Sequence, residues 1–539
     1  MLIEFRTPPN INEWVKNYGP GSAEREELKA ALKKAKSKAI EIPMVIGGKN
    51  VKGKKKIPIH PPHELKHKLG AYYLGEKKHV AEAIDAALKA KHEWEHTRWD
   101  ERAAVFLRAA DLLRYGWRQK MNAATMLCQS KNVHQSEIDA VCELADFFRF
   151  NVHFMQQIYA EQPYSPEGVR NSMDYRPLEG FVLAITPFNF TSIAGNLPTA
   201  PALMGNTVVW KPASTQIYSA WTIMELLREA GLPKGVINLI TSPGSVTGEA
   251  ALNHPELAGV HFTGSTATFQ HIWKTIGNNI SKYKSYPRIV GETGGKDFVI
   301  AHPSADVASL VTALTRGAFE YQGQKCSAAS RAYIPANLWK QVKEGLQRDI
   351  ASFKIGSPED FSNFINAVID AGAFDKITSY IRRAKKDKQE IIAGGNFSSK
   401  EGYFIEPTVI VAKKPGYVTM CEEIFGPVLT VYVYPEKKFE EALELVDTTS
   451  PYGLTGAIFS QDRKAISIAS QKLRYAAGNF YINDKPTGAV VGQQPFGGSR
   501  ASGTNDKAGS YLNLIRWTSP RAIKENLNPP KDYRYPFMM

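Results

Sequence analysis

Apolar residues recur along the chain at two different spacings, and the spacing changes near residue 180. From residue 79 to about residue 160, apolar positions such as Val80, Ile84 and Leu88 fall three or four apart, as in amphipathic helices. Between residues 181 and 293, short runs rich in β-branched and aromatic residues alternate with helical segments. These runs are 181–186, 207–211, 236–241, 259–264 and 288–293. The alternation predicts βαβ crossovers and a parallel sheet.

The polar residues that follow these runs are the first candidates for a binding site. Ligands of parallel sheets bind beyond the carboxyl ends of the strands. We therefore expect the segments 186–189, 211–214, 263–268 and 292–295 to line one cleft.

A second alternating set of strands and helices follows residue 293. Its apolar runs include SRAYIP, VLTVYVY and NFYIN, with helical segments between them. The sequence therefore predicts two α/β domains that meet near residue 293. The ends of the chain differ from both: residues 1–75 are rich in lysine and proline and predict an arm with one helix. Residues 510–539 are polar and extended, with no core of their own, so we expect them to pack on another domain or subunit.

The composition of this 539-residue chain excludes several classes of protein. Hydrophobic residues (43%) and charged residues (22%) occur in the proportions of a globular protein, which excludes disorder and coiled coil for the whole chain. The four cysteines are too few for a disulfide framework, and none are spaced as in a zinc ribbon. No segment is apolar for the roughly 18 residues of a membrane helix, and the first residues lack signal or transit features. We expect a cytoplasmic protein with no membrane partner and no metal site.

The net charge of +14 raises the question of nucleic-acid binding. The densest basic run, VKGKKKIPI, has no interleaved aromatic residues on which bases could stack. It is typical of a solvated loop, so we expect no nucleic-acid partner.

Candidate chemistry centres on three local patterns, and each has a plain alternative. Cys326 lies among small polar residues in Gly-Gln-Lys-Cys-Ser and, from this local sequence, is either an accessible nucleophile or a structural thiol. Glu292 ends a strand before two glycines and is either a catalytic carboxylate or a capping residue. Thr263-Gly264-Ser265 joins a strand to a helix and either binds a pyrophosphate or only caps the helix. No histidine in the sequence is an obvious partner for Cys326. The pattern therefore does not support an enzyme that uses a Cys/His pair.

Seven motifs occur in an order that resembles the aldehyde dehydrogenase superfamily, over about residues 45–520. They are Thr186-Pro-Phe-Asn189, Trp210-Lys-Pro-Ala213, Phe262-Thr-Gly-Ser265, Glu292-Thr-Gly-Gly-Lys296, Gly323-Gln-Lys-Cys326, Glu423-Ile-Phe-Gly-Pro427 and Pro495-Phe-Gly-Gly498. Their variants are similar to the branch that oxidises L-glutamate γ-semialdehyde, the open form of Δ1-pyrroline-5-carboxylate, to L-glutamate in proline catabolism. An alternative is another ω-semialdehyde, succinic or aminoadipic. A catalytically silent NAD-binding protein is a third possibility.

The resemblance implies roles for the catalytic residues. Cys326 is the nucleophile that forms a thiohemiacetal and then a thioester, Asn189 stabilises the oxyanion, and Glu292 activates the water that hydrolyses the thioester. The implied cofactor is NAD, bound by Thr186, Pro187, Phe188, Lys211, Pro212, Ser214, Gly264, Ser265, Thr268, Gly294, Glu423 and Phe425. Ser214 stands where many NAD-preferring members carry a glutamate, so this position does not discriminate against NADP.

The implied substrate residues are Phe190, Ser327, Gly488, Ala489 and Phe496. A loop from Lys485 to Ala489 holds the α-carboxylate and ammonium groups through backbone N–H groups, and the two phenylalanines sandwich the methylene chain. A serine often stands where this chain has Ala489, so we expect weaker substrate binding with the same preference.

The resemblance also implies a division of the chain and a homo-oligomer, at least a dimer. The expected parts are an N-terminal arm (1–45), a Rossmann-like NAD-binding domain (46–159 and 181–293), a catalytic domain (294–509), and a small bridging or oligomerisation hairpin (160–180 and 510–539).

Overall fold

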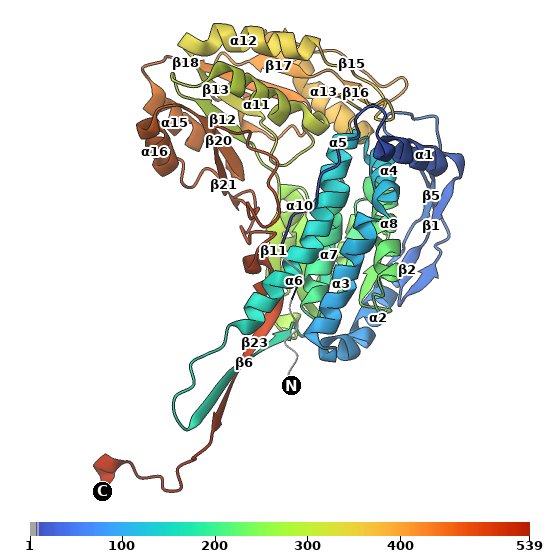
Figure 1. Ribbon diagram of the computed structural model, residues 1–539, viewed down its shortest axis with the longest axis vertical. Helices are drawn as coiled ribbons and strands as arrows, with labels where there is room; N and C mark the ends of the chain where they lie inside the picture. The colour runs from blue at the N-terminus through green and yellow to red at the C-terminus, as the bar shows by residue number, and fades with distance from the viewer. Residues whose placement is uncertain (1–6, 8–9) are drawn as a thin grey trace.

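The computed structural model describes residue 7 and residues 10–539. Residues 1–6 and 8–9, which belong to the predicted arm and to the start without targeting features, lie outside the described residues. Two sheets with helices on their faces lie one above the other in Figure 1, and a two-stranded hairpin projects from the lower one. The predicted α/β class with two parallel-sheet units is confirmed.

The first sheet has seven strands in the order β11-β10-β7-β8-β9-β2-β3. In chain order they are β2 (Met44–Ile46), β3 (Lys49–Val51), β7 (Phe181–Thr186), β8 (Thr207–Pro212), β9 (Ile237–Leu239), β10 (Leu257–Thr263) and β11 (Arg288–Glu292). The five runs predicted between residues 181 and 293 are all strands, and neighbouring ones pair in parallel. Strands β2 and β3 extend one edge in antiparallel fashion.

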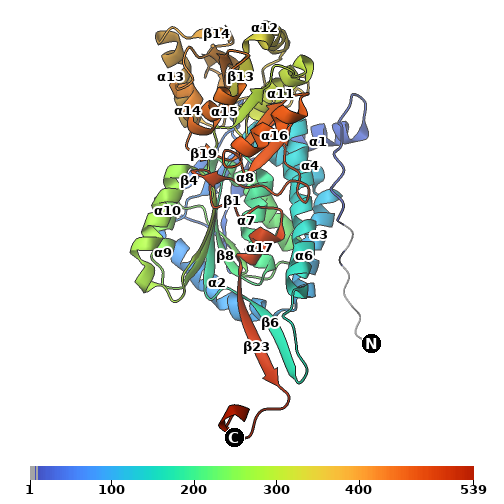
Figure 2. The same cartoon turned by 90° about the vertical axis from the view of Figure 1, so that its left-hand side faces the viewer.

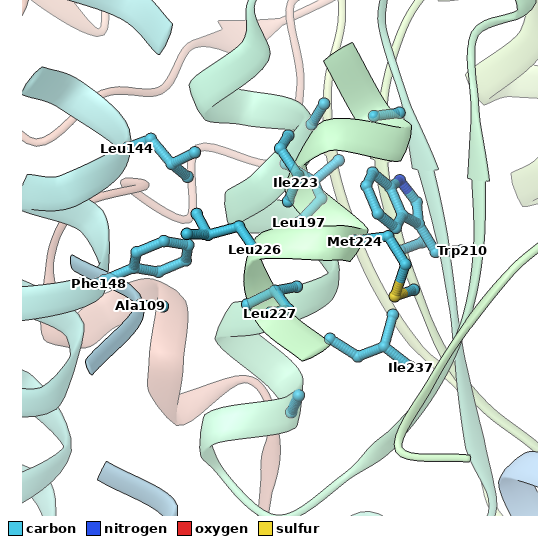
Figure 3. Close-up of a cluster of buried hydrophobic side chains, with 14 of the residues drawn as sticks. Ala109, Leu144, Phe148, Leu197, Trp210, Ile223, Met224, Leu226, Leu227 and Ile237 are labelled. Carbon is cyan, nitrogen blue, oxygen red and sulfur yellow. The ribbon is translucent and has the colours of Figure 1, made fainter. Parts of the chain in front are cut away.

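Helices cover both faces of this sheet. They are α2 (Lys77–His96), α3 (Trp99–Arg114), α4 (Arg118–Gln129), α5 (Val133–Ser136), the π-helix η1 (Glu137–Glu143), α6 (Leu144–Ala160), α7 (Thr191–Leu203), α8 (Ile217–Glu229), α9 (Gly244–Leu252), α10 (Thr266–Asn278) and the 3₁₀ turns η2 (Ser214–Gln216) and η3 (Ile280–Lys282). On one face Trp210 of β8 packs with Leu197 of α7 and Met224 of α8 (Figure 3). On the other, α2, α9 and α10 pack on residues such as Phe181.

The second sheet also has seven strands, in the order β14-β17-β18-β13-β12-β20-β21. They are β12 (Phe298–Ala301), β13 (Arg331–Pro335), β14 (Glu390–Ala393), β17 (Thr408–Val411), β18 (Val428–Tyr434), β20 (Thr455–Phe459) and β21 (Asn479–Ile482). Its helices are α11 (Val307–Phe319), the 3₁₀ turn η4 (Glu320–Gly323), α12 (Ala336–Ala351), α13 (Ala371–Lys386), α14 (Val418–Cys421), α15 (Phe439–Thr448) and α16 (Arg463–Lys472). The predicted division near residue 293 falls between β11 and β12.

Short strands outside the two large sheets complete the fold. The region before residue 75 is not a simple arm, because α1 (Ala23–Ser37) is followed by β1 (Ile40–Ile42), β4 (Lys56–Ile59) and β5 (Gly70–Tyr73), which form a three-stranded sheet. Strands of three or four residues are too short to show a period, so the sequence pattern missed them. Two further pairs join β15 (Phe397–Ser398) to β16 (Phe404–Ile405) and β19 (Tyr452–Gly453) to β22 (Ser499–Arg500).

The projecting hairpin joins β6 (Val169–Pro177) to β23 (Thr518–Asn526) in antiparallel register. It extends away from the body in both views, with the short turn η5 (Pro536–Met538) beyond it (Figures 1 and 2). The start of the segment 510–539 packs on another domain, as expected for residues that have no core of their own. Leu514 of α17 (Tyr511–Ile515) and Trp517 are fully buried in the core of the first sheet. No helix in the described part of the chain is long and apolar enough to cross a membrane.

Candidate active site

The carboxyl ends of the first sheet bring the predicted cleft segments to one edge. Thr186 pairs with Pro212 at the ends of β7 and β8, and Thr263 pairs with Glu292 at the ends of β10 and β11. Backbone hydrogen bonds continue beyond the strands, because Gly264 N donates to Glu292 O at 3.2 Å. The segments that the sequence placed around one cleft therefore do lie together.

Cys326 follows η4 in a loop that is held in an unusual backbone conformation. Tyr321 and Gln322 have left-handed φ values of 51° and 54°. Asn189 reaches this loop from the end of β7, where its Nδ2 donates to Gln324 O at 3.1 Å. On the other side, a Cβ at Gly295 would collide with the carbonyl oxygen of Cys326, so only glycine lets that turn lie so close. The structure thus brings Asn189 and the turn after Glu292 to the nucleophile loop.

The surroundings of Cys326 favour the neutral thiol. Burial raises the pKa of the Cys326 thiol well above its usual value. The negative charges of Asp297, Glu423 and Glu292 raise this pKa further, whereas the backbone N–H of Cys326 lowers it. The nearby cation Lys325 is engaged elsewhere, in a 3.2 Å ion pair with Glu320. The side chain of Cys326 nevertheless keeps partial access to solvent.

Glu292 is enclosed by the glycines of the Pro-Phe-Gly-Gly motif. Its Oε2 accepts a hydrogen bond from Gly498 N at 3.1 Å, and a Cβ at Gly497 would lie 3.0 Å from its Oε1. Burial raises the pKa of this carboxyl well above its usual value, while the Gly498 N–H and the charge of Lys507 lower it. Glu292 is therefore a carboxyl group with a raised affinity for a proton, as a general base at neutral pH requires.

Glu423 lies against the same glycine turn as Cys326. Its Oε1 accepts a hydrogen bond from Gly295 N at 3.0 Å. A Cβ at Gly294 would collide with its carboxylate, so the turn forms a cradle that any side chain would fill. Burial raises the pKa of Glu423. Two residues on, Phe425 meets Phe188 edge to face, with ring centroids 5.8 Å apart.

This cradle makes a specific prediction for Gly294→Ala. The added methyl group displaces the Glu423 carboxylate, which is the flexible end of a side chain, so the fold is retained. If Glu423 holds a cofactor ribose, loss of one charge-assisted hydrogen bond raises the KM for NAD about tenfold. The matched control is Gly277→Ala in α10, where nothing lies within 4 Å of an added Cβ. A Gly294→Ala enzyme with an unchanged KM for NAD contradicts this role.

The remaining predicted cofactor residues lie at the same edge. Ser265 caps α10, where its Oγ accepts from Thr268 N at 3.3 Å and contacts Thr268 Oγ1 at 2.8 Å. The first N–H groups of this helix lack partners within the helix and lie next to Gly264. Lys211 and Pro212 end β8, and burial lowers the pKa of Lys211. Ser214 is exposed at the start of η2. Thr186 is buried and accepts from Trp210 Nε1 at 3.0 Å, and Pro187 follows it at the same edge.

The predicted substrate residues are partly brought together. Ser327 Oγ lies 2.7 Å from Thr487 Oγ1, so the residue after Cys326 touches the loop that carries Gly488 and Ala489. Gly488 has a left-handed φ of 95° and is exposed, and Ala489 is half-buried. Phe190 and Phe496 are also half-buried, on the segment before α7 and in the loop after β21. The sandwich that they were expected to form stays a prediction.

Sequence patterns missed several polar groups next to the site. Lys131 lies over the Phe190 ring at 4.2 Å and pairs with Asp139 at 2.6 Å. Lys507 donates to Gly497 O at 3.0 Å, behind Glu292. From its sequence, the helical region from residue 79 to 160 is interpreted as scaffold, and no local pattern marks Lys131 or Asp139 as neighbours of the candidate site. Among the described residues, no group of three or more His, Cys, Asp or Glu could hold a metal ion.

Known proteins are similar to this chain in both sequence and fold. A delta-1-pyrroline-5-carboxylate dehydrogenase of Dictyostelium discoideum is 52% identical, over 99% of this chain and 96% of that protein. A crystal structure of the enzyme of that name from Mycobacterium tuberculosis, bound with NAD, is 53% identical with a TM-score of 0.97, over 100% of both chains. A 1-pyrroline-5-carboxylate dehydrogenase from Thermus with bound NAD is 31% identical with a TM-score of 0.91, over 97% of this chain and 100% of that one. The sequence pattern of the aldehyde dehydrogenase family matches residues 50–522, and the chain belongs to that family.

Proposed function

We propose that this protein oxidises L-glutamate γ-semialdehyde, in equilibrium with Δ1-pyrroline-5-carboxylate, to L-glutamate with reduction of NAD, as a step of proline catabolism. The observation that carries the proposal is the convergence of Asn189 and the Gly294–Gly295 turn on the Cys326 loop. The names of relatives that are about half identical over nearly the whole chain support the choice of substrate.

The residues present fit NAD. The cradle of Gly294 and Gly295 leaves room for the Glu423 carboxylate, which we assign to a ribose of the cofactor. The capped start of α10, with Gly264, Ser265 and Thr268, offers backbone N–H groups to the pyrophosphate. We assign Lys211, Pro212 and Ser214 to the adenosine side, and Thr186, Pro187, Phe188 and Phe425 to the nicotinamide side. When bound, NAD supplies the acceptor for the hydride that leaves the substrate carbon.

The protein side of the reaction follows from the residue types. Cys326, once deprotonated, adds to the aldehyde carbon, and the carbonyl oxygen becomes an oxyanion. The Asn189 amide and the Cys326 backbone N–H donate to that oxygen; loss of such a donor costs on the order of 3 kcal/mol in related sites. After oxidation, Glu292 removes a proton from water, which attacks the thioester and releases the acid and the thiol.

We propose that the loop from Lys485 to Ala489 binds the α-amino acid end of the substrate. The contact between Ser327 and Thr487 supports this, because it ties the loop to the nucleophile segment. The positive φ of Gly488 turns the backbone sharply at this point. Phe190 and Phe496 are assigned to the methylene chain, and Ala489 supplies no side-chain hydrogen bond.

A cofactor-reduction assay over a small panel of aldehydes tests the proposal. We expect kcat/KM for glutamate semialdehyde to exceed that for succinic and aminoadipic semialdehydes. A clear preference for either of the others overturns the substrate assignment. No NAD reduction with any aldehyde, together with measurable NAD binding, identifies a silent binding protein. Repeating the assay with NADP tests whether Ser214 admits the 2′-phosphate.

We further propose that the chain is divided into an NAD-binding domain, a catalytic domain and a bridging hairpin as the sequence predicts, with α1 and β1 in place of a simple N-terminal arm. We also propose that it assembles at least as a dimer through the hairpin of β6 and β23. The hairpin projects from the body and exposes Ile523 and Leu527, and β21, with exposed Ile482, is an edge strand that a neighbour can cover. Sedimentation analysis of the full chain tests this assembly.

The cytoplasmic location is also a proposal, because several relatives are named as mitochondrial. Cell fractionation distinguishes the two locations.

A further inference from the structure

We propose that the buried ion pair of Lys131 and Asp139 is a positioning device that sets the oxyanion segment against the nucleophile loop. The inference rests on the proposed function for its catalytic readout. Neither residue belongs to a motif that the sequence singled out, and neither touches the reacting atoms in the mechanism above. Both are positioning residues.

The pair is closed off from solvent. Lys131 Nζ lies 2.6 Å from Asp139 Oδ2, and the side chains are 0% and 1% exposed. Removing two charges from water is costly, and a buried ion pair often adds nothing to stability compared with apolar residues of the same size. A role in fixing geometry explains why this pair is buried at the point where α4 and η1 meet the two loops of the site.

Asp139 holds the segment that carries Asn189 and Phe190. Its two carboxylate oxygens accept the backbone N–H groups of Thr191 at 3.0 Å and Ser192 at 2.9 Å. These are the first residues of α7, where N–H groups lack partners within the helix. Asn189 and Phe190 directly precede these two residues in the chain. The position of the Asp139 carboxylate therefore fixes the position of the segment that carries the Asn189 side chain, the donor to the oxyanion.

Lys131 connects that segment to the loop before Cys326. Its ammonium lies over two rings, at 4.2 Å from the centroid of Phe190 and at 4.5 Å from that of Tyr321. Phe190 belongs to the oxyanion side, whereas Tyr321 stands in the strained turn that leads to the nucleophile. One buried cation therefore contacts both halves of the site.

The residues just before Lys131 make the same connection through hydrogen bonds. Gln129 Nε2 donates to Phe188 O at 2.7 Å, and Tyr321 Oη donates to Gln129 O at 3.1 Å. Ser130, with a left-handed φ of 55°, accepts from Gln322 Nε2 at 3.2 Å through its carbonyl oxygen. The end of α4 is thus a bridge between the two loops, and the ion pair fixes its orientation.

The test is the double variant Lys131→Met/Asp139→Leu, which removes both charges and leaves no lone buried ion. We expect a folded protein that keeps most of its affinity for NAD, because the residues assigned to the adenosine and the pyrophosphate lie on β8 and at the start of α10. A displacement of about 1 Å at Asn189 lowers kcat on the order of 100-fold, and displacement of Phe190 raises the KM for the aldehyde. Lys131→Arg, which keeps the cation and the pair, restores most of kcat.

The matched control is Arg102→Met. Arg102 is another buried cation, hydrogen-bonded to Leu203 O and Tyr159 Oη away from the site. A purely structural role for Lys131 predicts that both variants lose thermal stability and that neither changes kcat or KM when folded. That result, or equal losses of kcat in both, overturns the proposal.

A second measurement separates this inference from the proposed function. The rate at which iodoacetamide alkylates Cys326 reports the position of the nucleophile loop without any substrate. We expect the double variant to change this rate and Arg102→Met to leave it unchanged. If the wild-type protein oxidises no aldehyde, the proposed function fails, and an altered alkylation rate still supports the positioning role. An unaltered rate overturns it.

Discussion

We expect the substitution Cys326→Ala to abolish aldehyde oxidation and to leave NAD binding intact. Without the sulfur no thiohemiacetal forms, so there is no covalent species from which hydride can leave. Removing a catalytic nucleophile lowers kcat on the order of 10⁵-fold or more. The residues assigned to the adenosine, the pyrophosphate and a ribose lie on β8, α10 and the Glu423 segment, so we expect NAD binding, measured by titration calorimetry, to stay close to that of the wild type.

Cys421 provides the matched control for this experiment. It is the other cysteine with partial exposure, and burial raises its pKa as well. Cys421→Ala removes a comparable thiol outside the nucleophile loop and keeps its turnover. Substantial turnover in Cys326→Ala, or the same loss in both variants, contradicts the assignment of the nucleophile.

The pH dependence of alkylation tests the environment of Cys326 directly. Because burial and three carboxylates raise its pKa, little thiolate exists near neutral pH in the free enzyme. Below the pKa, the thiolate fraction and the alkylation rate rise about tenfold per pH unit. Iodoacetamide labelling followed by mass spectrometry from about pH 7 to about pH 9 measures this slope. A rate that levels off near about pH 8.5 indicates an ordinary pKa, and a rate that is flat over the whole range indicates a pKa below about 7; either result contradicts the raised pKa.

Local patterns were enough to predict the strand ends of the first sheet. Each run between residues 181 and 293 carries its own β-branched residues and turn, and parallel pairing then brings the polar ends to one edge. Thr263 and Glu292, at paired positions on β10 and β11, follow from this reasoning alone. The catalytic role proposed for Cys326 could not be predicted from its local sequence, because that sequence fits a structural thiol as well. The ordered motifs supplied that distinction.

Other features depend on contacts between distant segments and leave no local signal. Asp139 contacts Thr191 across 52 positions, and the π-helix that holds it has the same apolar spacing as an ordinary amphipathic helix. Trp517 is buried through packing on the first sheet, although the segment that follows it is mostly polar. The raised pKa of Cys326 likewise comes from burial under segments far away in the sequence, which composition cannot report.

The substitution Glu292→Gln separates the two halves of the reaction. Glutamine keeps a carbonyl oxygen that accepts from Gly498 N, so the local geometry survives while the base is lost. We expect a burst of NADH close to one equivalent per site, followed by steady turnover reduced on the order of 100-fold. Stopped-flow absorbance measures the burst, and mass spectrometry detects the accumulated thioester on Cys326.

The same variant tests whether the rate of thioester hydrolysis rises or falls with pH. A base whose pKa is raised is protonated, and therefore inactive, at low pH, so wild-type thioester hydrolysis speeds up as pH rises through that pKa. In Glu292→Gln this dependence disappears, because no proton needs to leave position 292. A variant with no burst and normal turnover removes Glu292 from the mechanism. If a burst occurs and the later phase keeps the wild-type pH dependence, another base carries out the hydrolysis. Lys507 is then the next residue to replace, because its charge acts on Glu292.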